Sequence, residues 1–498
     1  MTATAQMTPR QWLQSRMLFG IKTGLGNISQ LCARLGNPQD SFASVHLVGT
    51  NGKGSTSYWL TGILQAHGLK CGLFTSPHLV SVRERVRLGT EEAISEADFV
   101  QILAEVQQKS SQNPPLKITF FEALTAVALL WFQRQGVQIA VLEAGLGGRL
   151  DSTAIAQGSW TVLSSIGLDH QDVLGSSLQD VLREKLGIWQ RGSLWHTLLC
   201  NLIPLDFEYQ QIIAEQAQSI DGKVREVSSD EFLTLPHAGP VYQSNAHLAL
   251  AVSADILAKQ FDLATKPSFV AKSDFVAKFD AQKARQVLAR SPWWGRAQIL
   301  RKQLPENFRK PFQDSQELHN QPENSQSQSE NLQKPLQKGQ NPLEYSQNPL
   351  QKSQNKSEID WILDGAHNRA ASEALARTLA QIYPSKQPLV LMMGVLKTKN
   401  PAEIMEPLLP WIAEIHWVRT PHAKMRNPQE LQKFSQEKGI KSFAHASLDE
   451  AVQLLEAQSD VLCVGSLYLI GALVAKFSSK YPNLVWFRQF KVSDENEY

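Results

Sequence analysis

The sequence predicts an α/β protein of two domains, the first with a mainly parallel sheet and the second a smaller Rossmann-like unit. Three observations predict this fold class. The 498 residues exceed the size of one ordinary domain. Short apolar, β-rich runs alternate with helical patterns. Polar residues follow several of these runs, as they do at the carboxyl edge of open parallel sheets, where ligands bind.

A strand, a glycine loop, a helix and a second strand follow one another near the start of the chain. The run S-V-H-L-V at 44–48 is apolar and β-rich, and glycines come directly after it. Apolar residues with helical spacing begin after Ser55 and end near Gly68, and C-G-L-F at 71–74 predicts the next strand. This order predicts a βαβ unit, whose two strands are parallel.

Later apolar runs continue the alternation of strands and helices. Further strands are predicted at 139–142, 160–166, 361–363, 389–393, 415–418 and 461–464. The last run opens the most apolar late stretch of the chain, which Gly465, Gly471 and Lys476 interrupt. That stretch therefore predicts a buried strand and a helix, not a membrane span.

A glutamine-rich segment separates the two predicted domains. Residues 303–357 contain 12 glutamines with many Asn, Ser and Lys residues. Such a composition cannot bury enough apolar surface to offset the entropy lost on ordering. We expect a disordered insert or linker there, between domains at 1–302 and 358–498.

Composition and charge restrict the class of protein. Hydrophobic residues make up 42% and charged residues 19%, as in globular proteins, and the net charge of +2 indicates neither nucleic acid nor membrane as a partner. The four cysteines lie far apart without C-x-x-C spacing, which indicates a reducing compartment and no structural zinc. The first residues lack the pattern of a secretory signal. A cytoplasmic location is therefore expected.

The loop V-G-T-N-G-K-G-S-T at 48–56 resembles a phosphate-binding loop with altered spacing. The usual P-loop has its hydroxyl residue directly after the lysine, whereas Gly54 separates Lys53 from Ser55. Glycines let backbone N–H groups approach phosphate oxygens, and the following helix directs its positive end toward them. The alternative is a glycine-rich turn without a ligand, but the strand, the lysine and the helix favour a nucleotide site.

Three polar residues follow predicted strands at the same sheet edge as this loop. They are Ser76 in T-S-P-H-L, Glu143 in L-E-A-G-L-G-G-R-L-D and His170 in G-L-D-H. Taken singly, they have ordinary alternatives, namely a turn, a solvated strand end and a hydrogen-bonded histidine. Beside a triphosphate, however, a hydroxyl, a carboxylate and an imidazole can hold Mg²⁺. R-E-K-L-G-I at 183–188 places Lys185 on the next helical segment.

Ten motifs occur in the order of one known family, in both predicted domains. They are G-T-N-G-K-G-S-T, T-S-P-H-L, F-E-A-L-T, L-E-A-G-L-G-G-R-L-D, G-L-D-H, R-E-K-L-G-I, N-A-H-L-A-L-A, G-R at 295–296, D-G-A-H-N at 364–368 and G-S-L-Y-L-I-G at 465–471. On these motifs the chain resembles the dihydrofolate synthase/folylpolyglutamate synthase family of the Mur ligase superfamily. The glutamine-rich segment lies outside the resemblance. The resemblance implies a P-loop, Mur-ligase-like ATPase domain followed by a glutamate-ligase domain.

The resemblance also implies roles for individual residues. It implies ATP contacts at Gly52, Lys53, Gly54, Ser55, Asn245, Arg296 and Asp364. It implies binding of Mg²⁺, as two ions, by Ser76, Glu143 and His170. It implies a pteroate site at Thr119, Phe120, Phe121, Glu122, Leu150, Asp151 and Ser152. The implied catalytic residues are Lys53, His170 and Lys185.

Some of these roles have a stated chemistry. Lys185 matches a lysine that family members carry as a carbamate, which forms only from the neutral amine. Phe120 or Phe121 would stack on the pterin ring, with packing in the core as the alternative. Asp151 would accept hydrogen bonds from the N–H groups of the pterin. His367 shares the D-G-A-H-N loop with Asp364 and is expected near the nucleotide.

The activity implied is an ATP-dependent, amide-forming ligase. It would join L-glutamate to 7,8-dihydropteroate through an acyl phosphate, add further glutamates to reduced folates, and act as a monomer without nucleic acid. Three alternatives stay open: a folylpolyglutamate synthase only, a cell-wall Mur ligase, and a nucleotide-binding regulator without ligase activity. The short segment before Gly49 disfavours the second, and the pteroate motifs disfavour the third. Loose matches at 397–400 and 421–426 leave the length of the glutamate chain open.

Overall fold

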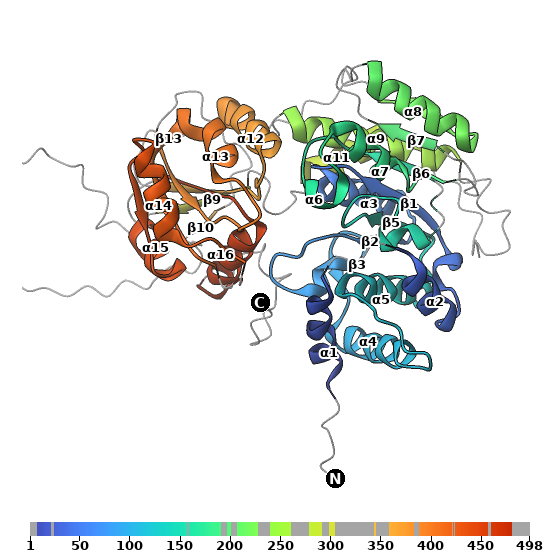
Figure 1. Cartoon of the computed structure of the whole chain (residues 1–498). Helices are drawn as coiled ribbons and strands as arrows, with labels where there is room; N and C mark the ends of the chain where they lie inside the picture. Colours follow the sequence, from blue (N-terminus) through green and yellow to red (C-terminus); the bar gives the residue numbers. More distant parts are fainter. Residues whose placement is uncertain are drawn as a thin grey trace, which may run out of the picture.

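A computed structural model of the chain contains two α/β units that lie side by side (Figure 1). It describes residues 7–20, 24–156, 158, 160–190, 197–200, 207–227, 240–259, 278–290, 298–303, 343–344, 358–382, 388–420, 422, 424–456 and 460–480. The amino-terminal unit contains the blue to yellow-green part of the chain, and the carboxy-terminal unit the orange to red part.

The sheet of the amino-terminal unit has the order β4-β3-β2-β5-β1-β6-β7-β8. Its strands are β1 Ala43–Val48, β2 Cys71–Phe74, β3 Val86–Leu88, β4 Glu92–Ala93, β5 Ile139–Glu143, β6 Trp160–Leu163, β7 Thr197–Cys200 and β8 Lys223–Glu226. The strands from β2 to β8 in this order pair in parallel, while β3 and β4 form an antiparallel edge. The prediction of a mainly parallel sheet is confirmed.

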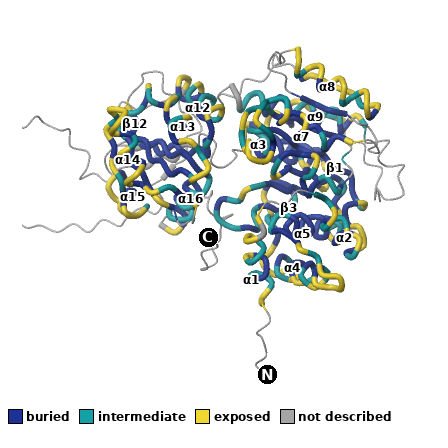
Figure 2. Tube along the Cα trace, viewed as in Figure 1, coloured by how far each residue is buried: buried dark blue, intermediate teal, exposed yellow. Residues whose placement is uncertain are grey.

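Helices cover both faces of this sheet. They are α1 Pro9–Arg16, α2 Gly26–Arg34, α3 Lys53–Ala66, α4 Glu96–Ser110, α5 Phe120–Arg134, α6 Gln171–Leu174, α7 Leu178–Leu186, α8 Phe207–Ile220, α9 Pro240–Ala258 and α11 Ala281–Arg290. On one face, Leu60 and Ile63 of α3 join Val45 and Leu47 of β1 in a buried cluster with α9. On the other face, α5 packs with α1, α2 and α4. Helices on both faces explain why β1 is buried along its whole length, as Figure 2 shows.

The carboxy-terminal unit has a second sheet of order β10-β9-β11-β15-β12-β13-β14. Its strands are β9 Gln298–Gln303, β10 Leu343–Glu344, β11 Glu358–Leu363, β12 Leu389–Met393, β13 Ile412–Trp417, β14 Ser442–Ala444 and β15 Val461–Val464. Its helices are α12 Arg369–Ile382, α13 Pro401–Met405, α14 Pro428–Glu437, α15 Leu448–Leu455 and α16 Leu467–Lys480. The strands from β11 to β14 are parallel, and β9 and β10 are antiparallel. A Rossmann-like second unit is thereby confirmed.

The second sheet takes one strand from before the predicted glutamine-rich segment. Strand β9 pairs with β11 from Gln298 to Gln303, although the sequence predicts that residues up to 302 belong to the first domain. Strand β10 lies inside the predicted segment and pairs with β9. The rest of 304–357 lies outside the described residues. No helix in the described part of the chain has the length and apolar character needed to cross a membrane.

A buried histidine on β1 predicts a loss of stability in acid. His46 is fully buried, its Nε2 lies 3.0 Å from the carbonyl oxygen of Thr153, and burial lowers its pKa to about 4. In the unfolded chain the His46 imidazole takes up a proton near pH 6.5, whereas in the folded protein it does so only near pH 4. The contribution of the buried neutral imidazole to the free energy of unfolding is therefore complete above pH 6.5 and is lost as the pH falls to about 4. We expect a loss of about 3 kcal/mol over this range, at about 1.4 kcal/mol for each pKa unit.

Urea unfolding at several pH values between about 7.5 and 4.5 measures this effect. In the variant His46→Gln, the free energy of unfolding should fall less steeply as the pH is lowered. The difference in slope should correspond to the uptake of up to one proton per molecule. Parallel curves for the two proteins would contradict the assignment.

Candidate functional site

The glycine loop joins β1 to α3 and forms the centre of the site. Gly52 has a φ of +84° and Gly49 a φ of +146°, which explains glycine at both positions. Helix α3 begins at Lys53, whose Nζ donates to the carbonyl oxygens of Gly49 at 2.9 Å and Thr50 at 3.2 Å. Backbone N–H groups at the start of this helix carry partial positive charge, so the loop can bind an anion.

Two hydroxyls at the start of α3 are buried without a hydrogen-bond partner. They are Ser55 Oγ and Thr56 Oγ1. Gly54 is also buried, in the first turn of the helix. A buried hydroxyl without a partner is costly, and a phosphate oxygen or a metal ion would satisfy it. The predicted phosphate loop thus has the donors that such a ligand requires.

Asn245 on α9 lies directly against the loop. A Cβ atom at Gly52 would meet the Oδ1 of Asn245 at 2.4 Å. The structure thus brings these two predicted ATP residues together, although 193 positions separate them in the sequence.

We expect Gly52→Ala to weaken nucleotide binding by at least about 10-fold, because the new methyl group is strained at positive φ and displaces Asn245. Titration of ATP into the purified variant measures this. Gly136→Ala is the control, since Gly136 has a φ of +63° but no neighbour within 4 Å. Equal ATP affinity in both variants would show that the contact with Asn245 is unimportant.

Two of the predicted metal residues, Ser76 and Glu143, lie at the carboxyl ends of the neighbouring strands β2 and β5, and the third, His170, follows β6. Glu143 ends β5 and is buried, and its Oε2 accepts the backbone N–H of Ser76 at 3.0 Å. His170 precedes α6 in the left-handed conformation, with φ +52°, and its side chain is 48% exposed. Among the described residues, no three His, Cys, Asp or Glu side chains group as a metal site. The predicted set adds a serine to two such residues, so it stays a prediction.

Cations surround His170. Burial lowers its pKa, Asp169 opposes this, and the charges of Lys399, Lys53 and Lys185 lower it further. A neutral imidazole is the form that can bind a metal ion. The positive charge around it also favours binding of an anion such as a triphosphate.

Lys185 lies buried beside the glycine loop. It is on α7, and its Nζ donates to the carbonyl oxygen of Gly49 at 2.8 Å, the same oxygen that Lys53 contacts. Burial, with the charge of Lys53, lowers the pKa of Lys185 to about 7, against the opposing charges of Asp169 and Asp151. About half of this lysine is therefore neutral near pH 7, which is the form that a carbamate requires.

The first predicted pteroate residues begin α5. Thr119 caps this helix by accepting the N–H of Glu122, and Glu122 accepts the N–H of Thr119 in return at 2.8 Å. The Phe121 ring packs against Phe74 with ring centres 5.5 Å apart, and the Arg85 guanidinium lies 5.5 Å from the centre of the Phe120 ring. A capping box explains the threonine and the glutamate without a substrate.

The second predicted pteroate stretch is tied to its own loop. Asp151 is buried; it accepts the N–H of Leu146 at 3.0 Å and both the N–H and the hydroxyl of Thr153. Burial raises its pKa, and these hydrogen bonds oppose the rise. Ser152 bonds Thr125 of α5 at 2.6 Å, so this contact joins the two predicted stretches. Leu150 lies half-buried beside Asp151. Their role in binding stays a prediction.

The second unit reaches the first through the D-G-A-H-N loop. Asp364 follows β11, is buried, and accepts the hydroxyl of Tyr242 of α9 at 2.7 Å. Asp364 thus lies against the helix that carries Asn245. His367 Nε2 lies 3.7 Å from Asp169. Arg296 lies outside the described residues.

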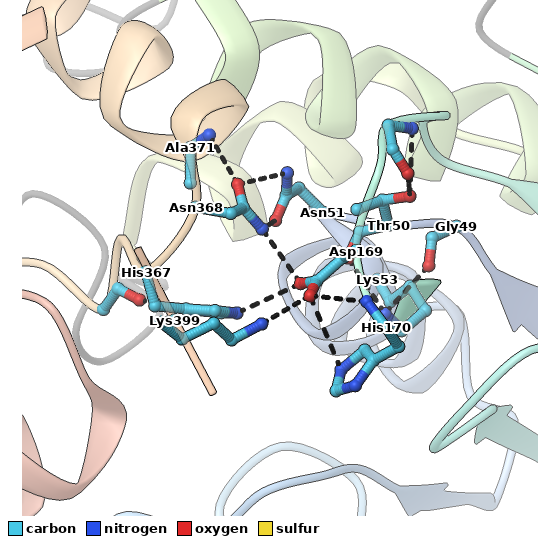
Figure 3. A network of polar contacts seen from close by, with 12 residues as sticks. Gly49, Thr50, Asn51, Lys53, Asp169, His170, His367, Asn368, Ala371 and Lys399 are labelled. Atoms are coloured by element: carbon cyan, nitrogen blue, oxygen red, sulfur yellow. Dashed lines mark hydrogen bonds and ion pairs between the residues drawn. The ribbon is translucent and has the colours of Figure 1, made fainter. Parts of the chain in front are cut away.

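Sequence reasoning missed a polar network between the two units, which Figure 3 shows. Asn368 Nδ2 donates to Asp169 Oδ2 at 3.1 Å and to Asn51 Oδ1 at 3.3 Å. Lys399 forms an ion pair with Asp169. Burial alone would raise the pKa of Asp169, but the charges of His170, Lys399 and His367 hold it well below its ordinary value. The signals in the sequence were that Asp169 and Asn368 stand inside motifs already singled out, and that Lys399 stands in the loosely matching stretch 397–400.

The comparisons with known proteins agree with this fold. Residues 345–476 match the family model described as dihydrofolate synthetase, C-terminal domain. The chain is 37% identical over 193 residues to the dihydrofolate synthase/folylpolyglutamate synthase of Bacillus subtilis (strain 168). This match covers 38% of the chain and 45% of the relative, so it spans less than half of that protein. It is 28% identical over 493 residues to the dihydrofolate synthetase of Saccharomyces cerevisiae, covering 93% of this chain and 100% of the relative.

A solved structure extends the likeness to the whole fold. The bifunctional folylpolyglutamate synthase/dihydrofolate synthase of Yersinia pestis, complexed with AMPPNP and a Mn ion, superimposes with a TM-score of 0.68 at 22% identity. The superposition covers 96% of this chain and 100% of that chain.

The fold and the glycine loop define a two-domain α/β protein in which a glycine loop joins β1 to α3 in the first unit. In sequence, the chain is similar to proteins named dihydrofolate synthase/folylpolyglutamate synthase and dihydrofolate synthetase.

Proposed function

We propose that this protein is an ATP-dependent ligase that joins L-glutamate to 7,8-dihydropteroate and adds further glutamates to reduced folates. One observation carries the proposal. Lys53 and Lys185 both donate to the Gly49 carbonyl oxygen at the start of helix α3, where the hydroxyls of Ser55 and Thr56 have no hydrogen-bond partner. The names of the relatives supply the substrate class. The role in the cytoplasm, as a monomer without nucleic acid, is part of the proposal.

The proposed reaction has two steps, and residues of this chain stabilise the charge that develops in the first. A carboxylate of the pteroate attacks the γ-phosphate of ATP, and an acyl phosphate forms as ADP leaves. Lys53 and the N–H groups at the start of α3 stabilise the negative charge that spreads over the transferred group. The amine of glutamate then attacks the acyl carbon, and phosphate leaves. No nucleophilic side chain is required, because positioning and charge stabilisation carry the reaction.

The residues present fit a magnesium site. Ser55 and Thr56 carry unpartnered hydroxyls, and the Glu143 carboxylate is buried at the adjacent strand end. We propose that Ser76, Glu143 and His170 hold the ion, and that a carbamate on Lys185 supports a second one. When bound, magnesium would neutralise charge on the phosphates and polarise the reacting group.

Closely apposed domains favour ligation over simple ATP hydrolysis. The contacts of Asp364 with Tyr242 and of Asn368 with Asn51 bring the second unit onto the first at the P-loop. Exclusion of water at this point would protect an acyl phosphate from hydrolysis.

The test is ATP turnover by the purified full chain with magnesium, with dihydropteroate and glutamate supplied separately and together, and with the product identified by its mass. Phosphate release only with both substrates, and a product one glutamyl unit heavier, is the expected result. Turnover without a new amide product would overturn the ligase proposal.

Folylpolyglutamate synthase activity alone is the second candidate. The observation that favours it is that Thr119, Glu122 and Asp151 use their polar groups within the fold, so the residues predicted for pteroate have structural roles. Replacing dihydropteroate with tetrahydrofolate in the same assay separates the two. If only tetrahydrofolate is extended, the narrower activity is correct.

A further inference from the structure

Four residues form a polar seam between the two units. They are Asn51 and Asp169 of the amino-terminal unit and Asn368 and Lys399 of the carboxy-terminal unit. The two carboxamides of Asn51 and Asn368 pair with each other, at 3.3 Å in each direction. Asp169 accepts from Asn368 at 3.1 Å and pairs with Lys399. Figure 3 shows Asn368 and Lys399 reaching Asp169, with Asn51 paired to Asn368.

The ion pair of the seam is largely shielded from water. The side chains of Asp169 and Lys399 are each 12% exposed. In such surroundings a charge that loses its partner is costly, because water cannot replace the lost interaction. His170 and His367 also face Asp169, at 3.9 and 3.7 Å. The carboxylate therefore holds contacts from three positions of the second unit, which are His367, Asn368 and Lys399.

The seam is tied to the glycine loop on one side. The backbone N–H of Asn51 donates to Ser165 Oγ at 2.8 Å, and its carbonyl oxygen accepts from Ser164 Oγ at 2.7 Å. Thr50 Oγ1 donates to the Gly167 carbonyl at 2.8 Å and accepts the Gly167 N–H at 3.0 Å. The loop between β6 and α6, which carries Asp169, is thus held against the glycine loop by these four hydrogen bonds.

The seam is tied to the second unit on the other side. Asn368 Oδ1 accepts the N–H of Ala371 at 2.9 Å, at the start of α12. The same residue closes the loop that contains Asp364 and His367. Lys399 stands on the loop after β12, whose main chain is braced by Arg426 donating to the Lys397 and Lys399 carbonyls at 3.2 Å.

We propose that the seam is a docking latch and that Asp169 is a positioning residue for the reaction. Its pairing with Lys399 and Asn368 holds the second unit against the glycine loop, so that Asp364 and His367 reach the nucleotide side of the site. Asp169 acts through these partners and not by contact with the transferred phosphate. The consequence for the reaction rests on the proposed ligase function, whereas the docking itself does not.

The first experiment measures docking without any substrate. Spin labels at Gln101→Cys on α4 and Glu437→Cys on α14 report the distance between the units, since both positions are exposed and the four native cysteines are buried. We expect a broader and longer distance distribution in Lys399→Met than in the parent. Lys397→Met, an exposed lysine two positions away, should leave the distribution unchanged. Identical distributions for Lys399→Met and the parent would overturn the latch.

The second experiment is a double-mutant cycle on turnover. We expect Asp169→Asn and Lys399→Met each to lower kcat at least 10-fold with a smaller change in the affinity for ATP, and the double variant to be no worse than the worse single variant. The thermal midpoint serves as a check that each protein is folded. If the losses in kcat of the two single variants add fully in the double variant, the pairing of Asp169 with Lys399 is not their cause. If the parent shows no pteroate-dependent turnover, the ligase proposal fails, while the distance measurement still decides on the latch.

Discussion

The variant Glu143→Ala is expected to lose at least about 100-fold in ATP turnover at ordinary magnesium concentrations, because it removes a buried carboxylate from a phosphoryl-transfer site. The same side chain accepts the N–H of Ser76 at 3.0 Å, so the loop that carries a second predicted ligand also loses an anchor. Initial rates across a magnesium titration measure the effect, and raised magnesium should recover part of it.

Two further variants separate binding of the ion from support of the loop. Glu143→Gln keeps the shape and an acceptor for the Ser76 N–H but loses the charge, so we expect a loss close to that of alanine. Glu437→Ala, at an exposed position of α14, is the matched control and should keep full turnover. Near-normal activity of Glu143→Gln would rule out a role of the charge in holding magnesium.

The variant Lys185→Met is expected to lose at least about 100-fold in turnover while it binds ATP with little change. Burial lowers the pKa of Lys185 to about 7, so its neutral form, which reacts with CO₂, increases as the pH rises through this value. The carbamate and the activity that depends on it should therefore fall as the pH drops below about 7. Removal of bicarbonate should slow the parent and leave the residual activity of the variant unchanged.

A direct signal distinguishes the carbamate from a plain cation. Protein incubated with ¹³C-labelled bicarbonate should give a carbamate carbonyl resonance that Lys185→Met lacks and that Lys109→Met, a half-buried lysine on α4, retains. The absence of this resonance in an active parent enzyme would contradict the modification. Lys185 would then be an unmodified cation that, like Lys53, donates to the Gly49 carbonyl oxygen.

The sequence predicted local features well because periodicity and glycine spacing report local geometry. The strands at 71–74, 389–393 and 461–464 have the predicted bounds. The predicted order of strand, glycine loop and helix is also observed, although the helix begins at Lys53 and not after Ser55. Positive φ at Gly49 and Gly52 explains why the loop could be identified before any fold was known.

The sequence could not show which polar groups are used up by the fold. Thr119 and Glu122 stand where a capping box places them, and Asp151 closes its own loop, so their side chains are occupied in the structure. The partners of Asp169 could not be predicted for another reason. Lys399 lies 230 positions away and Asn368 lies 199 away, and no local pattern specifies a pairing across domains.

Strand β9 changes what the glutamine-rich segment can control. Helix α11, the last helix seen in the amino-terminal unit, ends at Arg290, and β9 already belongs to the second sheet at Gln298. The covalent tether between the units is therefore residues 291–297, which can span about 25 Å at most. Residues 304–342 connect β9 to β10, which are neighbouring strands of the same sheet. Evolution can vary the length of this segment without altering the reach of one domain toward the other.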